Sequence, residues 1–350
     1  MIAARLTMAV DNVMQLPLVR SAETFVTRAL DARQPHLFPA IAAEHHDITT
    51  ADAGRISYYA DLKASGRPLI LLHGMHAAAS SYEMGPLFEA FRGKRKVYAL
   101  DLPGFGFSAR DEREYTPDTF VHAIEHLLRH AAQREPADVI ALSLTSEYAA
   151  KVAVELPELV RSLTLISPTG FAAPKQKSTL ELWSRRMQTQ LPELSELLPI
   201  RLFYELLVSK HRLRYFLRRS FERRVDEGLL AYAHATSHQA GAHRAPLAFL
   251  MGSLFPAGDP EKLYRHVRAP ALVIYDQDPY TSFERLESFL REQPSFRARR
   301  VQHTRGLPQF DAPQQTVEAL RSFYDELDSS NQRGISGGGG FSNGRFVGSA

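Results

Sequence analysis

One stretch near the middle of the chain most constrains its fold: residues 138–148 read Asp-Val-Ile-Ala-Leu-Ser-Leu-Thr-Ser-Glu-Tyr. The stretch begins as an apolar run typical of a buried strand, breaks at Ser143, and continues as a helix-compatible segment over 147–156. A strand that ends on a serine and turns at once into a helix lifts the hydroxyl clear of the sheet. The next backbone N–H then points into the same space. The stretch therefore predicts an α/β sheet with a serine exposed at the end of one strand.

Further segments of strand and helix character alternate along the chain. Strands are expected at 55–61, 68–74, 96–101, 160–167, 269–276 and 296–303, and helices at 82–91, 117–132, 282–292 and 313–327. This alternation predicts the α/β class with a doubly wound, mostly parallel sheet. Ligands of such sheets bind beyond the carboxyl ends of the strands, where Gly74, Ser143 and Pro168 fall.

The alternation is interrupted between residues 171 and 257, where helical segments rich in Leu, Arg and aromatic residues indicate a helical cap inserted into the core. The chain then divides into four parts. They are a partly helical lead-in over 1–45, an α/β core over 46–170 and 258–327, the helical cap over 171–257, and a flexible tail rich in Gly and Ser over 328–350.

Composition narrows the class of protein. The 350 residues are 44% hydrophobic and 23% charged, as in soluble globular proteins, and the net charge is only +3. The absence of cysteine excludes disulfides, thiolate metal sites and a cysteine nucleophile, and it fits a reducing compartment. No apolar run reaches the roughly 18 residues of a membrane span. Residues 1–19 lack the features of a signal peptide, so we expect a cytoplasmic protein.

Five motifs together resemble the α/β-hydrolase superfamily. In chain order they are Leu71-Leu-His-Gly74, the run 101–108 (Asp-Leu-Pro-Gly-Phe-Gly-Phe-Ser), the turn at Ser143, the run 272–279 (Leu-Val-Ile-Tyr-Asp-Gln-Asp-Pro) and the run 306–313 (Gly-Leu-Pro-Gln-Phe-Asp-Ala-Pro). Each motif is weak alone, but their order and spacing make residues 46–327 similar to this superfamily. The resemblance implies its fold and a serine nucleophile activated by a histidine and an acid, and it implies no cofactor.

The resemblance places the nucleophile at Ser143. The usual elbow reads G-x-S-x-G, because the residues two before and two after the serine crowd each other. Ala141 is small enough for the first of these positions, whereas the β-branched Thr145 departs from the pattern at the second. The alternative for Ser143 is a strand-end serine that caps the following helix.

The turn at Gly74 matches the superfamily's oxyanion turn. The resemblance implies that the backbone N–H groups of Met75 and Leu144 form the oxyanion hole, which contributes about 3 kcal/mol per donor where such a hole operates. His76 follows directly and is expected beside the substrate. The imidazole of His73 is expected to serve only as a hydrogen-bonding group at a strand end.

The acid and the base are harder to assign. Asp278 matches the superfamily's acid better than its neighbour Asp276 does, although both residues suit a turn. The histidine that should follow aligns with Gly306, so no imidazole stands at the usual position. His303, three residues earlier, is the first substitute; it lies up to about 10 Å away along an extended chain, whereas a base must come within about 3 Å of its proton. His76 is the second substitute.

Two functions remain open at this point. One is a hydrolase that cleaves an ester, thioester or amide of a hydrophobic small molecule through Ser143, with a displaced base. The other is a non-catalytic protein that keeps the fold and binds a ligand or a partner. A cofactor-free lyase or dioxygenase is a further alternative on the same fold.

Residues 201–224 hold eight Lys or Arg, two acidic residues and several aromatics. The simplest interpretation is an amphipathic cap helix with a basic outer face. Weak contact with a membrane surface is the second interpretation, testable by binding to anionic vesicles, and nucleic-acid binding is the least favoured. His234 and His238 are spaced as two ligands on one helix face, but no adjacent acid completes a set, so we expect no metal site.

Overall fold

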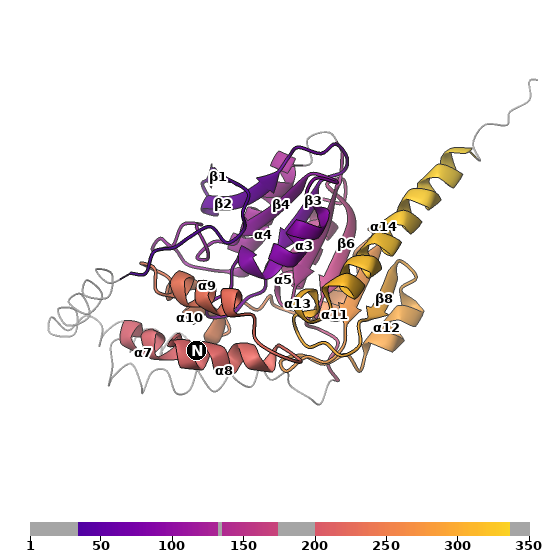
Figure 1. Ribbon diagram of the computed structural model, residues 1–350. Helices are drawn as coiled ribbons and strands as arrows, with labels where there is room; N and C mark the ends of the chain where they lie inside the picture. The colour runs from indigo at the N-terminus through magenta and orange to yellow at the C-terminus, as the bar shows by residue number, and fades with distance from the viewer. Residues whose placement is uncertain (1–33, 132–134, 174–199, 337–350) are drawn as a thin grey trace, which may run out of the picture.

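A computed structural model describes residues 34–131, 135–173 and 200–336, and within them an eight-stranded sheet runs through the middle of the molecule with helices on both faces (Figure 1). The strands are β1 (Glu44–Thr50), β2 (Gly54–Asp61), β3 (Leu69–Leu72), β4 (Val97–Asp101), β5 (Ala137–Leu142), β6 (Val160–Ile166), β7 (Ala271–Tyr275) and β8 (Phe296–Arg300). The predicted α/β class with a mostly parallel sheet is confirmed.

The sheet order is β1-β2-β4-β3-β5-β6-β7-β8. The pairs β1–β2 and β2–β4 are antiparallel, and every other neighbouring pair is parallel. The expected strands are all present, whereas β1 was not predicted and crosses the boundary drawn between the lead-in and the core. Its residues are exposed or half-buried because it lies at the sheet edge, so it carries no apolar run that would reveal it.

Alternating side chains of each central strand enter two separate helix layers. Leu69 and Leu71 of β3 pack with α3 (Gly85–Phe91) and α14 (Pro313–Ser336). Ile70 and Leu72 pack on the other face with α4 (Pro117–Ala131), α5 (Thr145–Glu155), α11 (Pro260–Arg265) and α12 (Leu286–Glu292). Since both faces are covered, the central strands are apolar throughout.

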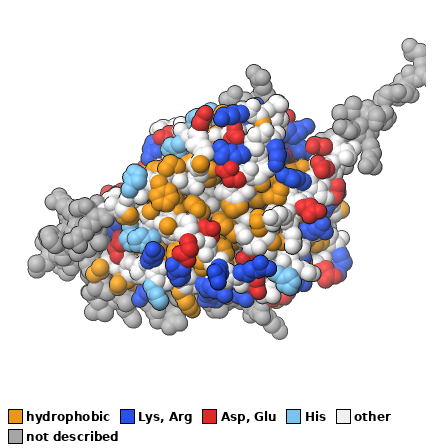
Figure 2. Space-filling view, viewed as in Figure 1, with side chains coloured by type: hydrophobic (Ala, Val, Ile, Leu, Met, Phe, Trp, Pro, Cys, Tyr) orange, Lys and Arg blue, Asp and Glu red, His pale blue; other side chains and the backbone are white. Residues whose placement is uncertain are grey.

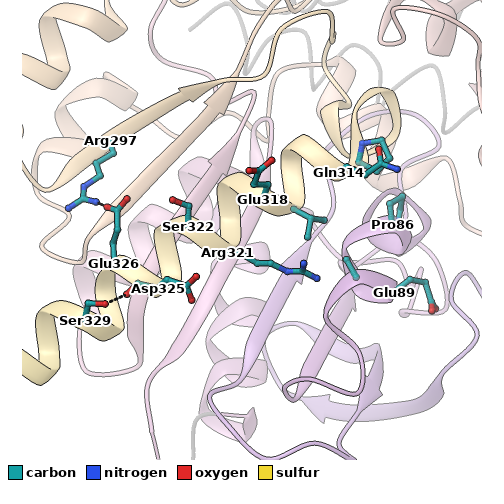
Figure 3. A pocket seen from close by; sticks show the side chains of 13 residues that line it. Pro86, Glu89, Arg297, Gln314, Glu318, Arg321, Ser322, Asp325, Glu326 and Ser329 are labelled. Carbon is teal, nitrogen blue, oxygen red and sulfur yellow. Dashed lines mark hydrogen bonds and ion pairs between the residues drawn. The ribbon is translucent and has the colours of Figure 1, made fainter.

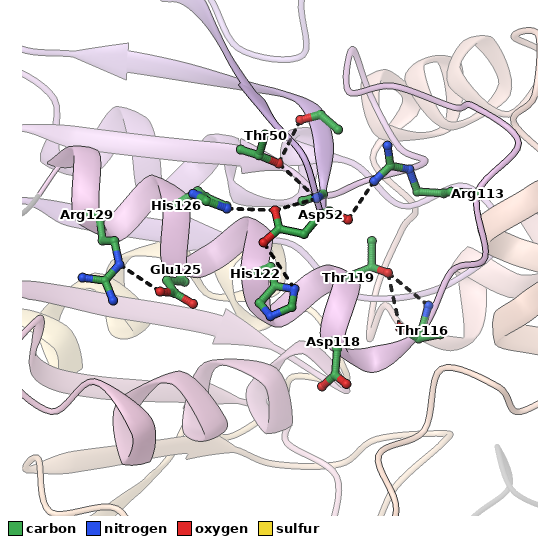
Figure 4. A network of polar contacts seen from close by, with 12 residues as sticks. Thr50, Asp52, Arg113, Thr116, Asp118, Thr119, His122, Glu125, His126 and Arg129 are labelled. Atoms are coloured by element: carbon green, nitrogen blue, oxygen red, sulfur yellow. Dashed lines mark hydrogen bonds and ion pairs between the residues drawn. The ribbon is translucent and has the colours of Figure 1, made fainter.

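A polar network fastens the β1–β2 hairpin to α4 (Figure 4). The Asp52 carboxylate accepts a hydrogen bond from His126 Nε2 at 2.9 Å and lies 3.6 Å from His122 Nδ1. The Arg113 guanidinium donates to the Asp52 carbonyl oxygen at 2.9 Å. These contacts hold the turn of the hairpin beside the exposed edge strand β1.

Further helices cover the carboxyl ends of the strands. They are α7 (Ile200–Leu207), α8 (Lys210–Arg219), α9 (Glu227–Ser237) and α10 (Arg244–Leu250). The Tyr204 hydroxyl of α7 donates to the Ala77 carbonyl oxygen at 2.9 Å, which ties these helices to the loop after β3. They occupy the described part of the expected cap, while residues 174–199 of that cap lie outside the described residues.

The boundary predicted for the C-terminal tail differs from the structure. Residues 1–33 of the lead-in and residues 337–350 of the tail lie outside the described part. The last helix was expected to end at Leu327, but α14 continues to Ser336, so the tail was assigned too early. Residues 328–334 include no apolar side chain, so the sequence pattern does not mark how far this helix extends. A short helix, α13 (Pro308–Asp311), precedes it.

Candidate active site

Ser143 stands on a sharp turn between β5 and α5. Its φ of 56° lies in the left-handed region, which a residue with a side chain rarely adopts. The turn is fixed on both sides, since the Ser143 amide donates to the Ile166 carbonyl oxygen at 2.9 Å and its own carbonyl accepts from the Ser146 amide at 3.0 Å. The observed turn therefore agrees with the predicted strand–serine–helix arrangement. Backbone strain from a positive φ costs of order 1 kcal/mol or more, and residues with such strain cluster at functional sites.

Thr145 occupies the second small-residue position of this turn without disrupting it. Its side chain is fully buried, and its hydroxyl donates to the His73 carbonyl oxygen at the end of β3 at 2.8 Å. The β-branched side chain fits because its oxygen satisfies a buried carbonyl of the neighbouring strand.

Replacing Thr145 with valine should lower the free energy of unfolding by about 1–3 kcal/mol, because the isosteric side chain leaves the buried His73 carbonyl without its donor. Urea denaturation measures the change. The matched Thr145→Ser variant keeps the hydroxyl and should lose less. A valine variant as stable as the parent protein would show that this hydrogen bond does not support the turn.

The imidazole of His73 is structural. It is fully buried, and its Nε2 accepts from the Leu102 amide at 3.0 Å. The other nitrogen, Nδ1, must then carry the proton and donates to the Gly74 carbonyl oxygen at 2.7 Å. Burial lowers the pKa of His73, which keeps the ring neutral. Both nitrogens are thus committed to the backbone.

The Met75 and Leu144 amides are the two expected oxyanion donors. Both residues are buried, and neither amide donates a hydrogen bond to an acceptor in the described part of the chain. Buried N–H groups without partners are rare in folded proteins. Two such groups, one on the residue after Gly74 and one on the residue after Ser143, suit the binding of a developing negative charge.

A cavity of about 500 Å³ opens over Ser143. Its wall includes Gly74, Met75, His76, Ser143 and Asp278, so five predicted site residues meet there, while Leu144 does not line it. Most other lining side chains are apolar. They are Leu142, Phe203, Leu207, Leu213, Phe216, Leu217, Ala233, Phe249, Leu250, Phe255 and Leu307. The cavity therefore suits a hydrophobic small molecule.

Asp278 lines the same cavity. Its Oδ1 accepts hydrogen bonds from the Tyr280 amide at 2.7 Å and the Thr281 amide at 3.0 Å. Burial raises the pKa of Asp278 to about 6. Its neighbour Asp276 instead faces away from the cavity, pairing with Arg300 at 2.7 Å. The preference for Asp278 over Asp276 thus agrees with their positions.

Replacing Asp278 with asparagine should change stability in a pH-dependent way. Because its pKa is raised from the ordinary value, the folded state binds the proton more tightly than the unfolded state does, and stability falls as the pH rises from about 4 to about 6. The variant lacks this loss, so its melting temperature relative to the parent should rise over that interval and then level off. A difference between the two proteins that is constant from pH 4 to pH 8 would contradict the raised pKa.

Gly306 adjoins the Asp278 carboxylate at the cavity wall. A Cβ atom added at Gly306 would lie 2.7 Å from Asp278 Oδ2, so the two residues adjoin at the cavity wall. No imidazole is present at this place. Among the described residues, no hydrogen bond joins the Ser143 hydroxyl to any histidine.

The structure does not bring His303 to Ser143. His303 is exposed on the turn after β8, with a φ of 60°, and it does not line the cavity. The turn is held from both sides, because the Thr304 amide donates to Asp276 at 3.1 Å and the Arg305 amide donates to Asp311 at 3.1 Å. The proposal of His303 as the base therefore lacks the necessary proximity.

His76 and Glu83 form an imidazole–carboxylate pair in the cavity wall. His76 Nε2 lies 2.6 Å from Glu83 Oε1, and Glu83 Oε2 accepts from the Gly74 amide at 2.9 Å. The Glu83 side chain is only 1% exposed. Burial acts to raise the pKa of Glu83, but His76 and the hydrogen bonds outweigh burial and lower the pKa below its ordinary value. Glu83 therefore stays ionised and orients His76.

Glu83 was missed by sequence reasoning. It lies in a 3₁₀ turn, Ser81–Met84, that leads into α3, and that turn places it beneath the Gly74 loop. Its spacing from His76 along the chain matches none of the sequence motifs described above, so only the folded structure reveals the pair.

Other histidines are less suitable. His211 of α8 lines the cavity but is exposed to solvent. His234 and His238 of α9 stack at 4.1 Å and do not line it. Across the described ranges, no group of three or more His, Asp or Glu side chains could hold a metal ion.

The outer surface carries two further features. A wider and mostly polar depression of about 1110 Å³ lies between α3 and α14 and contains none of the predicted site residues (Figure 3). Lys and Arg side chains gather over α8, whose Leu213 and Leu217 are buried (Figure 2). Within the parts that the structure describes, no helix combines the length and apolar character needed to cross a bilayer.

Comparison with known proteins agrees with the observed fold. A family model described as "Alpha/beta hydrolase family" matches residues 69–319. The chain is 28% identical over 141 residues to 2-(acetamidomethylene)succinate hydrolase of Mesorhizobium japonicum, covering 40% of this chain and 50% of that protein. It is 31% identical over 156 residues to 2-hydroxymuconate semialdehyde hydrolase of a Pseudomonas species, covering 43% of this chain and 54% of that protein. The chain thus spans about half the length of these curated relatives.

A solved structure supports the fold over a longer stretch. The crystal structure of a bacterial membrane phospholipase A superposes with a TM-score of 0.65 at 19% identity, covering 93% of this chain and 98% of that one. At this identity the similarity concerns the fold alone.

Proposed function

Because the chain belongs to the α/β hydrolase family, we propose that it is a serine hydrolase that cleaves an ester, thioester or amide of a hydrophobic small molecule through Ser143. One observation carries the proposal: Ser143 is held at a φ of 56° at the wall of an apolar cavity, beside two buried amides that have no acceptor among the described residues. Backbone strain of this kind clusters at functional sites.

His76 is the base in this proposal. It lines the same cavity as Ser143 and is oriented by the buried Glu83 carboxylate, as the histidine of a catalytic triad is oriented by its acid. With Nε2–H directed at Glu83, Nδ1 is the acceptor nitrogen. At present Nδ1 receives only a long hydrogen bond of 3.3 Å from the Ala78 amide, which a small ring movement on substrate binding would release.

The reaction follows from these positions. The Ser143 oxygen attacks the carbonyl carbon of an ester as its proton passes to His76 Nδ1, and the Met75 and Leu144 amides hold the oxyanion. The carbon–oxygen bond to the alcohol then breaks, and the alcohol leaves with the proton from His76. Water attacks the acyl-serine by the same route, which releases the carboxylic acid and restores Ser143.

Hydrolysis of nitrophenyl esters of increasing acyl length tests the proposal. Turnover should depend on Ser143 and should be lost in Ser143→Ala. Ser220→Ala is the matched control, because Ser220 lines the same cavity outside the turn and its hydroxyl takes no part in the reaction. Turnover that survives in Ser143→Ala would remove the serine from the mechanism.

A second candidate function rests on Gly306. Since the usual histidine is absent there, the cavity could bind its ligand without cleaving it. This alternative predicts stoichiometric binding of hydrophobic ligands with no turnover of any ester, and the same assay separates the two functions.

A further inference from the structure

We propose that the recess between Asp278 and Gly306 binds a protonated amine, so that the cavity selects hydrophobic compounds that carry a basic nitrogen. The inference rests on the site of the proposed function and names its ligand class, but it concerns binding and does not require turnover. Four observations carry it.

First, the Asp278 carboxylate has no ion-pair partner in the described part of the chain. The other acid at the cavity wall, Glu83, is paired with His76, and the adjacent Asp276 is paired with Arg300. A carboxylate enclosed by apolar surface without a cation is unfavourable, and a cationic ligand group would relieve this cost. Its raised pKa has the same origin.

Second, Asp278 retains capacity to accept hydrogen bonds. Its Oδ1 receives the Tyr280 and Thr281 amides, and the Ser167 hydroxyl lies beside the carboxylate. A carboxylate has about four acceptor positions, so at least one remains for a ligand.

Third, Gly306 places no side chain against the Asp278 carboxylate. A Cβ at this residue would lie 2.7 Å from Oδ2 and 3.8 Å from the Ser220 Cβ. Gly306, Asp278 and Ser220 all line the cavity, so the carboxylate borders the space open to the ligand. The absence of a side chain thus exposes the carboxylate to whatever occupies the cavity.

Fourth, the surroundings favour a cation attached to an apolar body. The remaining wall is largely aromatic and aliphatic, with Arg212 and His211 as its other basic residues besides His76. The Arg219 guanidinium is engaged over the Tyr280 ring, 5.4 Å from its centroid. A hydrogen bond between a charged amine and this carboxylate should favour the amine over a matched alcohol by about 10-fold or more.

The test compares three ligands of equal shape: phenylbutylamine, phenylbutanol and phenylbutyrate. Affinities are measured by calorimetry at pH 7.5 with full-length Ser143→Ala protein, so that no reaction contributes. The amine should bind about 10-fold or more tightly than the alcohol, and the carboxylate should bind most weakly. Asp278→Asn should abolish the preference, and Gly306→Ala should reduce it by placing a methyl group against Oδ2. Asp276→Asn, which removes an acid outside the cavity, should retain the preference.

Each binding result tests the inference independently of whether the protein hydrolyses an ester. Equal affinities for amine and alcohol, no measurable binding of the amine, or a preference that survives in Asp278→Asn would overturn it. An amine preference that depends on Asp278 would support it even if no ester is hydrolysed, in which case only the proposed function would fail.

Discussion

Replacing Gly306 with histidine in a protein that lacks His76 (His76→Ala) should raise the rate of ester hydrolysis by about 10²- to 10⁴-fold, the usual contribution of a well-placed general base. Gly306 lies against Asp278 and lines the cavity together with Ser143, so an imidazole at this residue would complete a serine–histidine–acid arrangement. The backbone permits a side chain, since Gly306 is not in the left-handed region. The contact of 2.7 Å between the new Cβ and Asp278 Oδ2 requires only that the carboxylate end of that side chain move slightly.

Two variants distinguish the effect of the imidazole as a base from the effect of its added volume. Gly306→Ala adds the same Cβ without a base and should give no gain, and Gly306→His combined with Ser143→Ala should be inactive. Rates are measured on a nitrophenyl ester, and melting temperature verifies folding. A folded protein that carries both His76→Ala and Gly306→His and shows no gain in rate over His76→Ala would show that Ser143 and residue 306 do not share a reactive geometry.

Replacing His76 with alanine should reduce turnover of the same ester by about 10²- to 10⁴-fold, with a smaller change in KM, because it removes the group that accepts the serine proton. The control is His211→Ala, which removes an exposed cavity histidine that has no carboxylate partner among the described residues. Added imidazole should restore part of the activity to His76→Ala and none to Ser143→Ala.

The two histidine variants are coupled in a way that tests the base directly. If a histidine at residue 306 acts as a second base, removing His76 should reduce ester turnover much less in Gly306→His than in the parent protein. The effects of the two substitutions on turnover should therefore not add. Full activity in His76→Ala would place the base elsewhere and contradict its proposed role.

The sequence was sufficient for the central sheet and for the turn at Ser143. Apolar runs revealed β2 to β7 because those strands are largely buried, whereas β8 was predicted although it is mostly exposed, and the abrupt change from strand to helix located Ser143. The edge strand β1 and the far end of α14 escaped because polar, exposed segments carry no burial pattern.

The partners proposed for Ser143 were only partly predicted from the sequence, which named His76 as the second substitute base but put His303 first and missed Glu83. His303 is close to Gly306 along the chain, but hydrogen bonds to Asp276 and Asp311 hold its turn so that the ring faces solvent. Glu83 belongs to none of the sequence motifs, and only the 3₁₀ turn before α3 brings it under Gly74. Both outcomes depend on loop geometry, which short motifs do not encode.

Covalent labelling tests the central claim, that Ser143 is a reactive nucleophile facing the cavity. The full-length protein is incubated with a fluorophosphonate, digested, and the adduct is mapped by mass spectrometry. We expect one adduct per chain on the peptide that contains Ser143, formed more slowly in His76→Ala and absent from Ser143→Ala. A folded protein that acquires no adduct, or one that is modified equally in Ser143→Ala, would contradict the claim.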